Sequence, residues 1–393
     1  MELSYILNEL GEERDLYFNA IAPPILQTSN FAFKNIADFR KALTDEYDAL
    51  LYSRGNNPTI DILRKKLAAL DGAEDALVFG SGIASISIPI LALLSQGDHV
   101  VSVAKPYSWT VKLFEKILPR FGITTTFVDG TQTLNFEKAI QPNTRLIYLE
   151  SPNTFTYELQ DLEAVAHLAK SKKITTMIDN SYCSPINQQP VKMGIDLVAQ
   201  SATKFIGGHS DVVAGVVTGS KALIKKIFEA EFLNIGGNIS PMNAWLLIRG
   251  LRTLHLRMDR VCASTKKVVE FLVAHPKIEK VIFPFHPSFT QYELAKKQMK
   301  DAGGLFSIIL KARSVEEIEQ FCDSLKHFFR AVSWGGHESL VIPALVGFPV
   351  TDFDPSNEHH RLVRLYVGLE DPDYLIADLK QAFDSYYSPD IGH

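Results

Sequence analysis

Cysteine is scarce in this chain, and its three copies are scattered. Cys183, Cys262 and Cys322 lie far apart and show none of the spacings of a metal site. Their number and spacing argue against a disulfide framework and predict a protein of a reducing compartment. We therefore expect neither structural disulfides nor a metal centre, so the stability of the chain must come from its apolar core.

Concentrated charge and long apolar runs are also missing. The formal net charge is -5 at pH 7, and no long basic run is present, so nucleic acid is not an expected partner. The longest apolar run, residues 83–94, contains serines and a proline and is too short to span a membrane. The N-terminus lacks the basic and apolar regions of a signal peptide. We expect a cytoplasmic protein without membrane contact.

Short apolar runs are present, and they alternate with helical patterns. Buried strands are expected at residues 76–79, 99–103, 123–128, 146–149, 174–178, 196–200 and 212–217. Strands that alternate with helices at this spacing predict a mostly parallel sheet covered on both faces. Ligands of such sheets bind at the carboxyl ends of the strands.

The chain divides into three expected parts. Residues 1–50 are poorly periodic and contain the extended segment Ile21-Ala22-Pro23-Pro24-Ile25, because proline disfavours helix. We interpret them as an arm that contacts a neighbouring subunit, although a simple surface strap fits equally. Residues 51–240 form the large domain. Residues 241–393 form a smaller α/β domain, with strands expected at 281–283, 305–310 and 361–367.

A single lysine stands between the last two runs of the large domain. It belongs to the segment Ser201-Ala202-Thr203-Lys204-Phe205-Ile206-Gly207-Gly208. A lysine held in a dry turn tends to lose its proton and can then form a Schiff base. The alternative is an ordinary surface lysine, which the glycine pair and the flanking hydroxyls disfavour.

Three further features belong to the same predicted edge of the sheet. Tyr107 and Asp179 each follow the end of an expected strand, as Lys204 does. The stretch at 80–85, rich in small residues, opens a helix after a strand, where backbone N–H groups can approach a phosphate, although a plain tight turn fits as well. A lysine, a carboxylate for a ring nitrogen and an aromatic for a ring face together indicate pyridoxal phosphate.

Arg364 stands inside an apolar run, flanked by Leu362, Val363 and Leu365. A buried guanidinium requires an anionic partner. Either a substrate carboxylate or an internal salt bridge would supply that negative charge.

These features resemble the pyridoxal-phosphate enzymes of cysteine and methionine metabolism, a trans-sulfuration family. The family includes cystathionine β- and γ-lyases, cystathionine γ-synthase, methionine γ-lyase and homoserine-ester sulfhydrylases. The likeness runs from about residue 23 to 383, and its motifs are residues 52–59, 81–84, 178–180, 201–213, 249–254 and 362–371. The resemblance implies the aspartate aminotransferase type I fold. It also implies a large, mostly parallel seven-stranded sheet domain, a smaller C-terminal α/β domain and pyridoxal 5'-phosphate as cofactor.

The resemblance assigns the matching residues roles at the cofactor. Lys204 is expected to form the Schiff base and to shuttle protons, and Asp179 to pair with the pyridine nitrogen. Tyr107 is expected to stack on the ring and to help activate the substrate amine. The residues expected to hold the phosphate are Gly82, Ile83, Ser201 and Thr203, with Tyr52 and Arg54 from a neighbouring subunit.

The remaining implied roles concern the substrate. The residues expected to contact it are Arg364, Ser333, Thr154 and Glu338, with the guanidinium of Arg364 on the α-carboxylate. A phosphate site completed by a second subunit implies a homodimer or homotetramer with shared active sites.

Some positions depart from the pattern of the family. Ser151-Pro152-Asn153-Thr154-Phe155 stands where many members have Ser-Pro-x-Asn-Pro, so Thr154 replaces the asparagine. Trp109 stands where methionine γ-lyases carry a cysteine, which counts against that activity. The run Ser333-Trp334-Gly335-Gly336 resembles bacterial cystathionine β-lyases, and His337 follows where an aromatic is often found. The loop at 52–59, in contrast, resembles the γ-type enzymes.

The function expected on this basis is a carbon–sulfur lyase acting on cystathionine or a related amino acid. β-Elimination would give pyruvate and ammonia, and γ-elimination would give 2-oxobutyrate and ammonia. The alternative is a γ-replacement enzyme, either a cystathionine γ-synthase or an O-acyl-homoserine sulfhydrylase, with methionine γ-lyase less favoured. A non-catalytic protein that keeps the fold is disfavoured by the presence of Lys204, Asp179, Tyr107 and Arg364.

Overall fold

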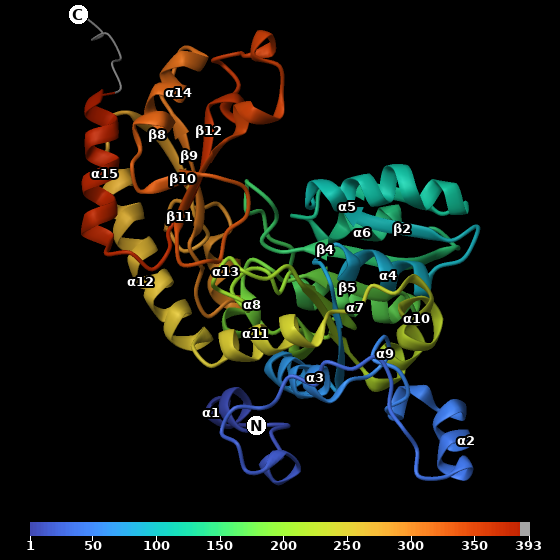
Figure 1. The fold of residues 1–393 in the computed structure, drawn as a ribbon. Coiled ribbons are helices and arrows are strands. Elements are labelled where there is room, and N and C mark those ends of the chain that lie inside the picture. The colour runs from blue at the N-terminus through green and yellow to red at the C-terminus, as the bar shows by residue number, and fades with distance from the viewer. Residues whose placement is uncertain (386–393) are drawn as a thin grey trace, which may run out of the picture. The chain divides into compact units, whose positions relative to one another are not determined.

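The computed structural model describes residues 1–385, which form two compact units (Figure 1). The first unit comprises Met1–Thr154, Glu158–Gly207 and Asp211–Leu254. The second comprises the short segments Phe155–Tyr157 and Gly208–Ser210 and the described part of His255–His393. The C-terminal domain expected from the sequence extends to residue 393, so its residues 386–393 lie outside the described residues.

A seven-stranded sheet forms the centre of the first unit, as the sequence predicts. The strand order is β1-β7-β6-β5-β4-β2-β3, with β7 antiparallel to both of its neighbours and the strands from β6 to β3 all parallel. The bounds are β1 (Asp75–Phe79), β2 (His99–Val103), β3 (Thr124–Val128), β4 (Thr144–Glu150), β5 (Thr175–Asp179), β6 (Leu197–Gln200) and β7 (Gly215–Gly219). The expected strand at 212–217 therefore begins three residues later, at Gly215.

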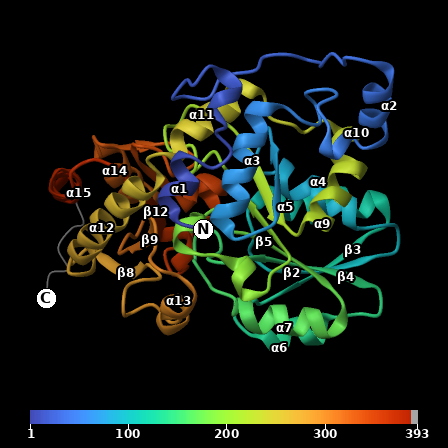
Figure 2. The same ribbon diagram turned by 90° about the horizontal axis from the view of Figure 1, so that it is seen from below.

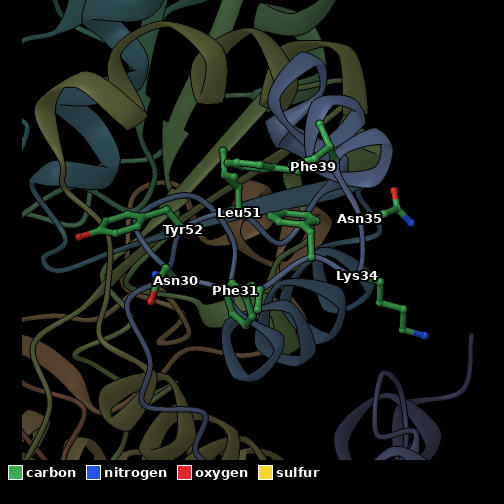
Figure 3. A pocket seen from close by; sticks show the side chains of 10 residues that line it. Asn30, Phe31, Lys34, Asn35, Phe39, Leu51 and Tyr52 are labelled. Atoms are coloured by element: carbon green, nitrogen blue, oxygen red, sulfur yellow. The ribbon is translucent and has the colours of Figure 1, made fainter.

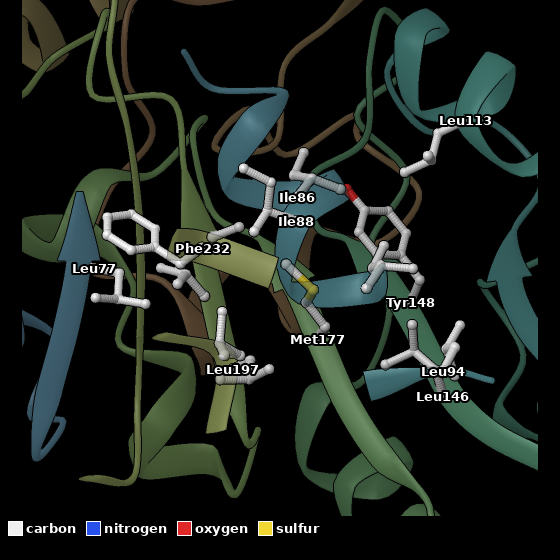
Figure 4. Close-up of a cluster of buried hydrophobic side chains, with 14 of the residues drawn as sticks. Leu77, Ile86, Ile88, Leu94, Leu113, Leu146, Tyr148, Met177, Leu197 and Phe232 are labelled. Atoms are coloured by element: carbon white, nitrogen blue, oxygen red, sulfur yellow. The ribbon is translucent and has the colours of Figure 1, made fainter. Parts of the chain in front are cut away.

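Helices of the first unit cover both faces of this sheet (Figures 1 and 2). Because side chains alternate along a strand, Tyr148 of β4 packs with Met177 and Leu197 on one face, in the cluster shown in Figure 4. Its neighbours Ile147 and Leu149 point to the opposite face and pack against residues of α6 and α7. The helices are α1 (Leu3–Asn8), α2 (Ile36–Thr44), α3 (Pro58–Asp71), α4 (Ala84–Leu93), α5 (Ser108–Lys112), α6 (Thr133–Ala139), α7 (Leu162–Lys172), α8 (Ser184–Asn187), α9 (Lys221–Ile227), α10 (Leu233–Ile235) and α11 (Pro241–Leu251).

The start of α3 explains much of the motif at residues 52–59. Asn57 Oδ1 caps the helix by accepting the N–H of Thr59 at 3.0 Å, and Pro58 occupies the first helical turn. Asn56 Nδ2 donates to the carbonyls of Glu46 and Tyr47 at 2.7 and 2.9 Å. Both asparagines therefore shape the loop.

Buried charges anchor the first residues of the chain on α3. Lys66 Nζ lies 3.0 Å from Glu12 Oε1, and both side chains are fully buried. Arg252, which follows α11, donates to the two carboxylate oxygens of Glu12 at 2.9 and 3.0 Å. Lys66 also donates to the carbonyls of Ile6 and Leu7. A buried charge without a partner is strongly unfavourable, and here Lys66, Glu12 and Arg252 are each paired.

The second unit contains a five-stranded sheet in the order β10-β11-β12-β9-β8. Its strands are β8 (Ile278–Ile282), β9 (Leu305–Leu310), β10 (Phe328–Arg330), β11 (Ser339–Pro343) and β12 (Leu362–Tyr366). Its helices are α12 (Leu254–Val273), α13 (Tyr292–Gln298), α14 (Val315–Ser324) and α15 (Pro372–Ser385). The rings of Phe321 and Phe383 stack at 4.6 Å between centroids and join α14 to α15.

Short 3₁₀ and π-helical turns complete the described chain. They are η1 (Arg14–Tyr17), η2 (Glu46–Asp48), η3 (Leu113–Ile117), η4 (Leu118–Phe121), η5 (Pro190–Met193), η6 (Phe228–Phe232), η7 (Ala344–Gly347), η8 (Val350–Asp352) and η9 (Glu358–Arg361). Of the helices in residues 1–385, none has the length and apolar character that crossing a bilayer demands.

A buried carboxyl at the end of α3 supports the strand that leads to Lys204. Asp71 is 1% exposed and accepts hydrogen bonds from Gln200 Nε2 at 3.0 and 2.9 Å and from Thr218 Oγ1 at 2.7 Å. No cation of residues 1–385 pairs with it. Burial raises the pKa of Asp71 to about 7, against the opposing effect of these hydrogen bonds. Gln200 Oε1 is buried without a hydrogen-bond partner.

We expect Asp71→Asn to stabilise the protein at pH 8 by about 2–4 kcal/mol, with a gain that grows between pH 5 and pH 8. The pKa of Asp71 is higher in the folded than in the unfolded chain. Its contribution to the free energy of unfolding is therefore most favourable at low pH and falls as the pH rises toward about 7. An amide removes the charge and can donate to Gln200 Oε1.

Denaturant unfolding from pH 5 to pH 8 measures this gain. The control is Asp323→Asn, since the Asp323 side chain is 70% exposed. A gain for Asp71→Asn that does not change with pH would contradict the prediction.

Candidate active site

The carboxyl ends of four parallel strands bring the expected cofactor residues to one edge of the large sheet. Asp179 is the last residue of β5, and it lies opposite Glu150, the last residue of β4. Tyr107 stands between β2 and α5, and Lys204 follows β6. The structure thus places Tyr107, Asp179 and Lys204 at the carboxyl edge of the sheet, where the sequence predicts them.

Asp179 is held in a fixed orientation by a neighbouring serine. Its Oδ1 accepts the backbone N–H of Ser181 at 2.9 Å and the hydroxyl of Ser181 at 2.6 Å. Burial raises the pKa of Asp179, while the hydrogen bonds from Ser181 and the charge of Lys204 lower it. No hydrogen bond to Oδ2 occurs within the described chain. One oxygen is therefore fixed by the protein, and the other remains for a cationic partner.

The loop that carries Lys204 is packed tightly against α11. Lys204 donates its backbone N–H to Ser201 at 3.1 Å, and Gly207 donates its own to Ala202 at 2.8 Å. A Cβ added to Gly250 would lie 2.5 Å from the carbonyl oxygen of Gly207, closer than real Cβ atoms come. Glycine at 250, in the motif at 249–254, therefore lets the helix approach and support the lysine loop.

The turn before α4 fits a phosphate. A Cβ on Gly82 would lie 2.7 Å from Ser201 Oγ, so the absence of a side chain at 82 brings the turn and the lysine loop together. The backbone amides of Gly82 and Ile83 donate to no other residue in the part of the chain that the structure describes. Exposed amides at the start of a ten-residue helix attract anions, and a serine hydroxyl stands beside them. This donor set suits the phosphate of pyridoxal phosphate.

The hydroxyl of Thr203, which the sequence analysis assigns to the phosphate, forms hydrogen bonds with the backbone of Ala214. Thr203 Oγ1 donates to the carbonyl of Ala214 at 3.1 Å and accepts the N–H of Ala214 at 2.9 Å. These two bonds close the lysine loop onto the segment that precedes β7. The expected contact of Thr203 with the phosphate stays a prediction.

Tyr52 and Arg54 lie on an exposed loop of the first unit. The guanidinium carbon of Arg54 is 5.3 Å from the centroid of the Tyr52 ring. Tyr52 also lines a cavity of about 750 Å³, together with Phe31, Phe39 and Leu51 (Figure 3). Within residues 1–385 neither side chain forms a hydrogen bond with Gly82 or Ser201, so their phosphate role also stays a prediction.

Glu150 is a buried carboxyl at this edge that the sequence analysis missed. It is 6% exposed, and its Oε2 accepts the backbone N–H of Tyr107 at 2.6 Å while its Oε1 accepts the hydroxyl of Thr154 at 2.7 Å. Burial and the charge of Asp179 raise the pKa of Glu150 to about 8. One signal could have found it, since a carboxylate directly precedes the motif at 151–155 and ends a strand, as Asp179 does.

The Tyr107 hydroxyl keeps its proton at neutral pH. Burial and the charges of Asp179 and Glu150 raise its pKa. The ring is 37% exposed, so it remains accessible, and its backbone is held by Glu150. Tyr107 is therefore placed to donate a proton or a hydrogen bond. Trp109, two residues later, is 55% exposed, and the ammonium of Lys112 lies 4.0 Å from its ring centroid.

The second unit brings Arg364 and Ser333 together. Arg364 of β12 is 7% exposed, and its Nη2 donates to the carbonyl of Ser333 at 2.9 Å. Burial lowers the pKa of the guanidinium, and Tyr157 opposes that effect. No carboxylate among residues 1–385 pairs with Arg364. The sequence left two possible sources of negative charge for Arg364, a substrate carboxylate or an internal salt bridge. The described residues do not form the salt bridge.

Glu338 belongs to the same unit and faces a serine. Its Oε1 accepts the hydroxyl of Ser210 at 2.6 Å, and its Oε2 lies 3.2 Å from Nδ1 of His337. Ser210 adopts the left-handed conformation, with φ of 57°. These contacts fix the Glu338 carboxylate in place, and its expected contact with substrate remains a prediction.

Comparisons with known proteins agree with this arrangement. A family model described as Cys/Met metabolism PLP-dependent enzyme matches residues 6–384. An L-methionine gamma-lyase from Treponema denticola is 38% identical over 93% of this chain and 93% of its own length. A cystathionine gamma-lyase from Macaca fascicularis is 35% identical over 98% of this chain and 94% of its own length. The crystal structure of metB from Corynebacterium glutamicum has a TM-score of 0.90 and 34% identity, and the match covers 98% of this chain and 99% of that one.

We expect Gly82→Ala to weaken the binding of pyridoxal phosphate to the apoprotein by about tenfold or more, or ~1.4 kcal/mol. The new Cβ would lie 2.7 Å from Ser201 Oγ and 2.8 Å from Ser201 Cβ, so the turn and the lysine loop must separate. Equilibrium titration of the apoprotein measures the affinity, and its thermal unfolding reports on the fold. The control is Gly347→Ala, where an added Cβ meets nothing within 4 Å. An unchanged affinity for Gly82→Ala would mean that the phosphate binds elsewhere.

Proposed function

The chain belongs to the family of Cys/Met metabolism PLP-dependent enzymes, and within it we propose that it removes a thiol from the γ carbon of cystathionine or a closely related amino acid. It is a carbon–sulfur lyase of the trans-sulfuration type. The observation that carries the proposal is the placement of Lys204 beside the buried Asp179, with a proton-bearing Tyr107 at the same strand edge. These groups are what thiol elimination from an amino acid requires.

Pyridoxal phosphate, when bound, supplies an aldehyde that condenses with the substrate amine and an electron-poor ring that accepts the electron pair of the deprotonated Cα. Asp179 Oδ2 is the group proposed to keep the ring nitrogen protonated, since Oδ1 is already engaged by Ser181. The amides of Gly82 and Ile83 and the hydroxyl of Ser201 are proposed to hold the phosphate. Lys204 is proposed to carry the aldehyde in the resting enzyme.

Two residues are proposed to move protons during the reaction. Lys204 Nζ, when free of the aldehyde, would take the proton from Cα, pass it to the bound cofactor and then take one from Cβ, because a single amine can hold only one of the two protons at a time. The Cγ–S bond breaks, and the thiolate takes a proton, for which the protonated hydroxyl of Tyr107 is a suitable donor. With cystathionine and one water, the products are cysteine, 2-oxobutyrate and ammonia.

Arg364 is proposed to bind the α-carboxylate of the substrate. Its guanidinium is buried and has no carboxylate partner in the described chain, so an incoming carboxylate would supply the missing negative charge. A guanidinium can bind both oxygens of a carboxylate at once.

Two observations bear on the choice of substrate. The Treponema relative is named for methionine and the Macaca relative for cystathionine, and both are gamma-lyases, which favours elimination at the γ carbon. Trp109 stands where the methionine enzymes carry cysteine, which favours cystathionine over methionine. γ-Replacement on a homoserine ester is the second candidate, because it proceeds through the same deprotonation at Cα and Cβ.

A homo-oligomer with shared sites is proposed from the exposed N-terminal arm. Ile36 and Leu43 of α2 are 70% and 59% exposed, and Phe39 and Tyr52 both line the cavity of Figure 3. So much exposed apolar surface is typical of an interface. A second copy of the chain at this surface would cover the cavity and would receive Tyr52 and Arg54 near its own phosphate site.

We expect purified holoenzyme to convert L-cystathionine to 2-oxobutyrate and cysteine, and L-methionine at least about tenfold more slowly by kcat/KM, which corresponds to ~1.4 kcal/mol in transition-state binding. Mass spectrometry identifies the products, and the rate of oxo acid formation from each substrate gives kcat/KM. Pyruvate from cystathionine would instead indicate β-elimination. If no oxo acid forms and cystathionine appears from cysteine and a homoserine ester, the enzyme is a γ-replacement enzyme and the lyase proposal is wrong.

A mixing experiment tests the shared site. Lys204→Ala and Arg54→Ala are each expected to lose most of their activity, since the first removes the amine proposed to carry the cofactor and the second a proposed phosphate ligand. In randomly mixed dimers, about a quarter of all sites would have both residues intact if Arg54 acts across the interface. Co-expression should therefore restore about a quarter of wild-type activity. Activity no higher than the sum of the two single variants would place Arg54 in its own subunit's site or outside any site.

A further inference from the structure

Phe155 has a left-handed backbone conformation, which is rare for an aromatic residue. Its φ is 66°, and Tyr157, two residues later, has φ of 56°. Aromatic residues rarely adopt the left-handed conformation, because it brings Cβ close to the backbone carbonyl. Proline, which the resembling motif has at this position, is confined to φ near −65° and could not adopt it. Contacts elsewhere must therefore hold this segment in place.

The segment is anchored beside Arg364. Residues Phe155–Tyr157 belong to the second unit, although the chain on either side belongs to the first. Ser307 Oγ donates to the carbonyl oxygen of Phe155 at 2.9 Å and lies 3.3 Å from the hydroxyl of Tyr157. Ser307 of β9 is the strand partner of Arg364 in β12. The hydrogen bond to Ser307 thus ties Phe155 to the position directly next to the arginine.

Two aromatic rings accompany the guanidinium of Arg364. Its central carbon is 5.3 Å from the ring centroid of Phe155 and 5.4 Å from that of Trp334. Rings at this distance stabilise a desolvated cation without neutralising it. Nη2 is fixed by the carbonyl of Ser333 at 2.9 Å. Of the groups that surround the arginine in residues 1–385, none supplies a negative charge.

This environment restricts how an anion can reach Arg364. Aromatic rings attract the cation but offer nothing to its N–H donors, and one of those donors is taken by Ser333. The remaining N–H groups lie in the plane of the guanidinium, where a planar carboxylate can meet two of them. The buried cation is kept in position before any anion arrives, so less side-chain entropy is lost on binding.

We propose that Phe155 is a positioning residue for the substrate α-carboxylate, which together with Trp334 holds the buried Arg364 guanidinium in a fixed plane. The proposal rests on the proposed function, in which Arg364 binds that carboxylate. It gives the left-handed conformation of Phe155 a purpose, since the residue whose carbonyl Ser307 holds is the one whose ring lies 5.3 Å from the guanidinium carbon of Arg364. The expected consequence is preference for ligands that carry a free α-carboxylate.

The test compares glycine with glycinamide, which has the same amine and lacks the carboxylate. Holoenzyme is titrated with each, and the change in cofactor absorbance gives the dissociation constant without any elimination. Phe155→Leu keeps an apolar side chain and removes the ring, so we expect it to weaken glycine binding by about tenfold and to leave glycinamide binding within about twofold of wild type. Phe155→Tyr keeps the ring and is expected to bind glycine like wild type.

Controls separate this role from a general loss of structure. Phe329→Leu removes a ring that is 57% exposed and is expected to change neither affinity. Phe155→Leu that binds glycine normally, or that loses glycine and glycinamide equally, would overturn the proposal. Arg364→Ala that still prefers glycine to glycinamide would instead refute the carboxylate role of Arg364, and the positioning role of Phe155 would be refuted with it. Retained lyase chemistry in Phe155→Leu at saturating substrate, with only KM raised, would support positioning.

Discussion

The burial of Asp179 is the constraint around which the large unit is arranged. A carboxylate removed from water at the end of β5 is unfavourable unless a cation faces it, and burial accordingly raises its pKa. Lys204 is the cation that the chain itself provides, and Ser181 orients one oxygen through two hydrogen bonds. The hydroxyl of Ser181 in turn accepts the N–H of Ser201 at 2.6 Å, so the carboxylate and the lysine loop are fixed by the same side chain. In the proposed function, the ring nitrogen of the cofactor would meet Oδ2, which receives no hydrogen bond within residues 1–385.

Close backbone packing fixes the position of the loop that carries Lys204, the cation that Asp179 requires. Gly82 approaches Ser201, and Gly250 approaches Gly207, at distances that no side chain would allow. One contact joins the lysine loop to the start of α4, and the other joins it to α11. Asp71 also stabilises this region, because its carboxylate accepts two hydrogen bonds from Gln200, the residue before the loop. The lysine is thus positioned by helices and strands rather than by its own loop, which is how rigid sites are usually built.

The sequence predicted the large unit well because its strands are continuous apolar runs. The run at 99–103 matches β2 residue for residue, and in the second unit the apolar run at 305–310 matches β9 in the same way. In contrast, β10 and β11 were missed, since β10 has three residues, two of them exposed, and β11 ends in proline. Strand ends also predicted the common location of Tyr107, Asp179 and Lys204. Periodicity carries no information on side-chain contacts, so neither the Glu150 bond to Tyr107 nor the engagement of Thr203 by Ala214 could be foreseen.

Thr154 and Phe155 belong to a segment whose conformation does not follow from its residue types. Thr154 gives its hydroxyl to Glu150, and the next residue, Phe155, takes a conformation that its side chain disfavours. Both belong to the short segment that departs from the pattern of the family, and they contact a carboxyl of the first unit and an arginine of the second. A backbone strain of this kind persists only where the surrounding contacts outweigh it. Since the cofactor residues match the pattern of the family and this segment does not, differences in substrate preference within the family are expected to arise here rather than at Lys204 or Asp179.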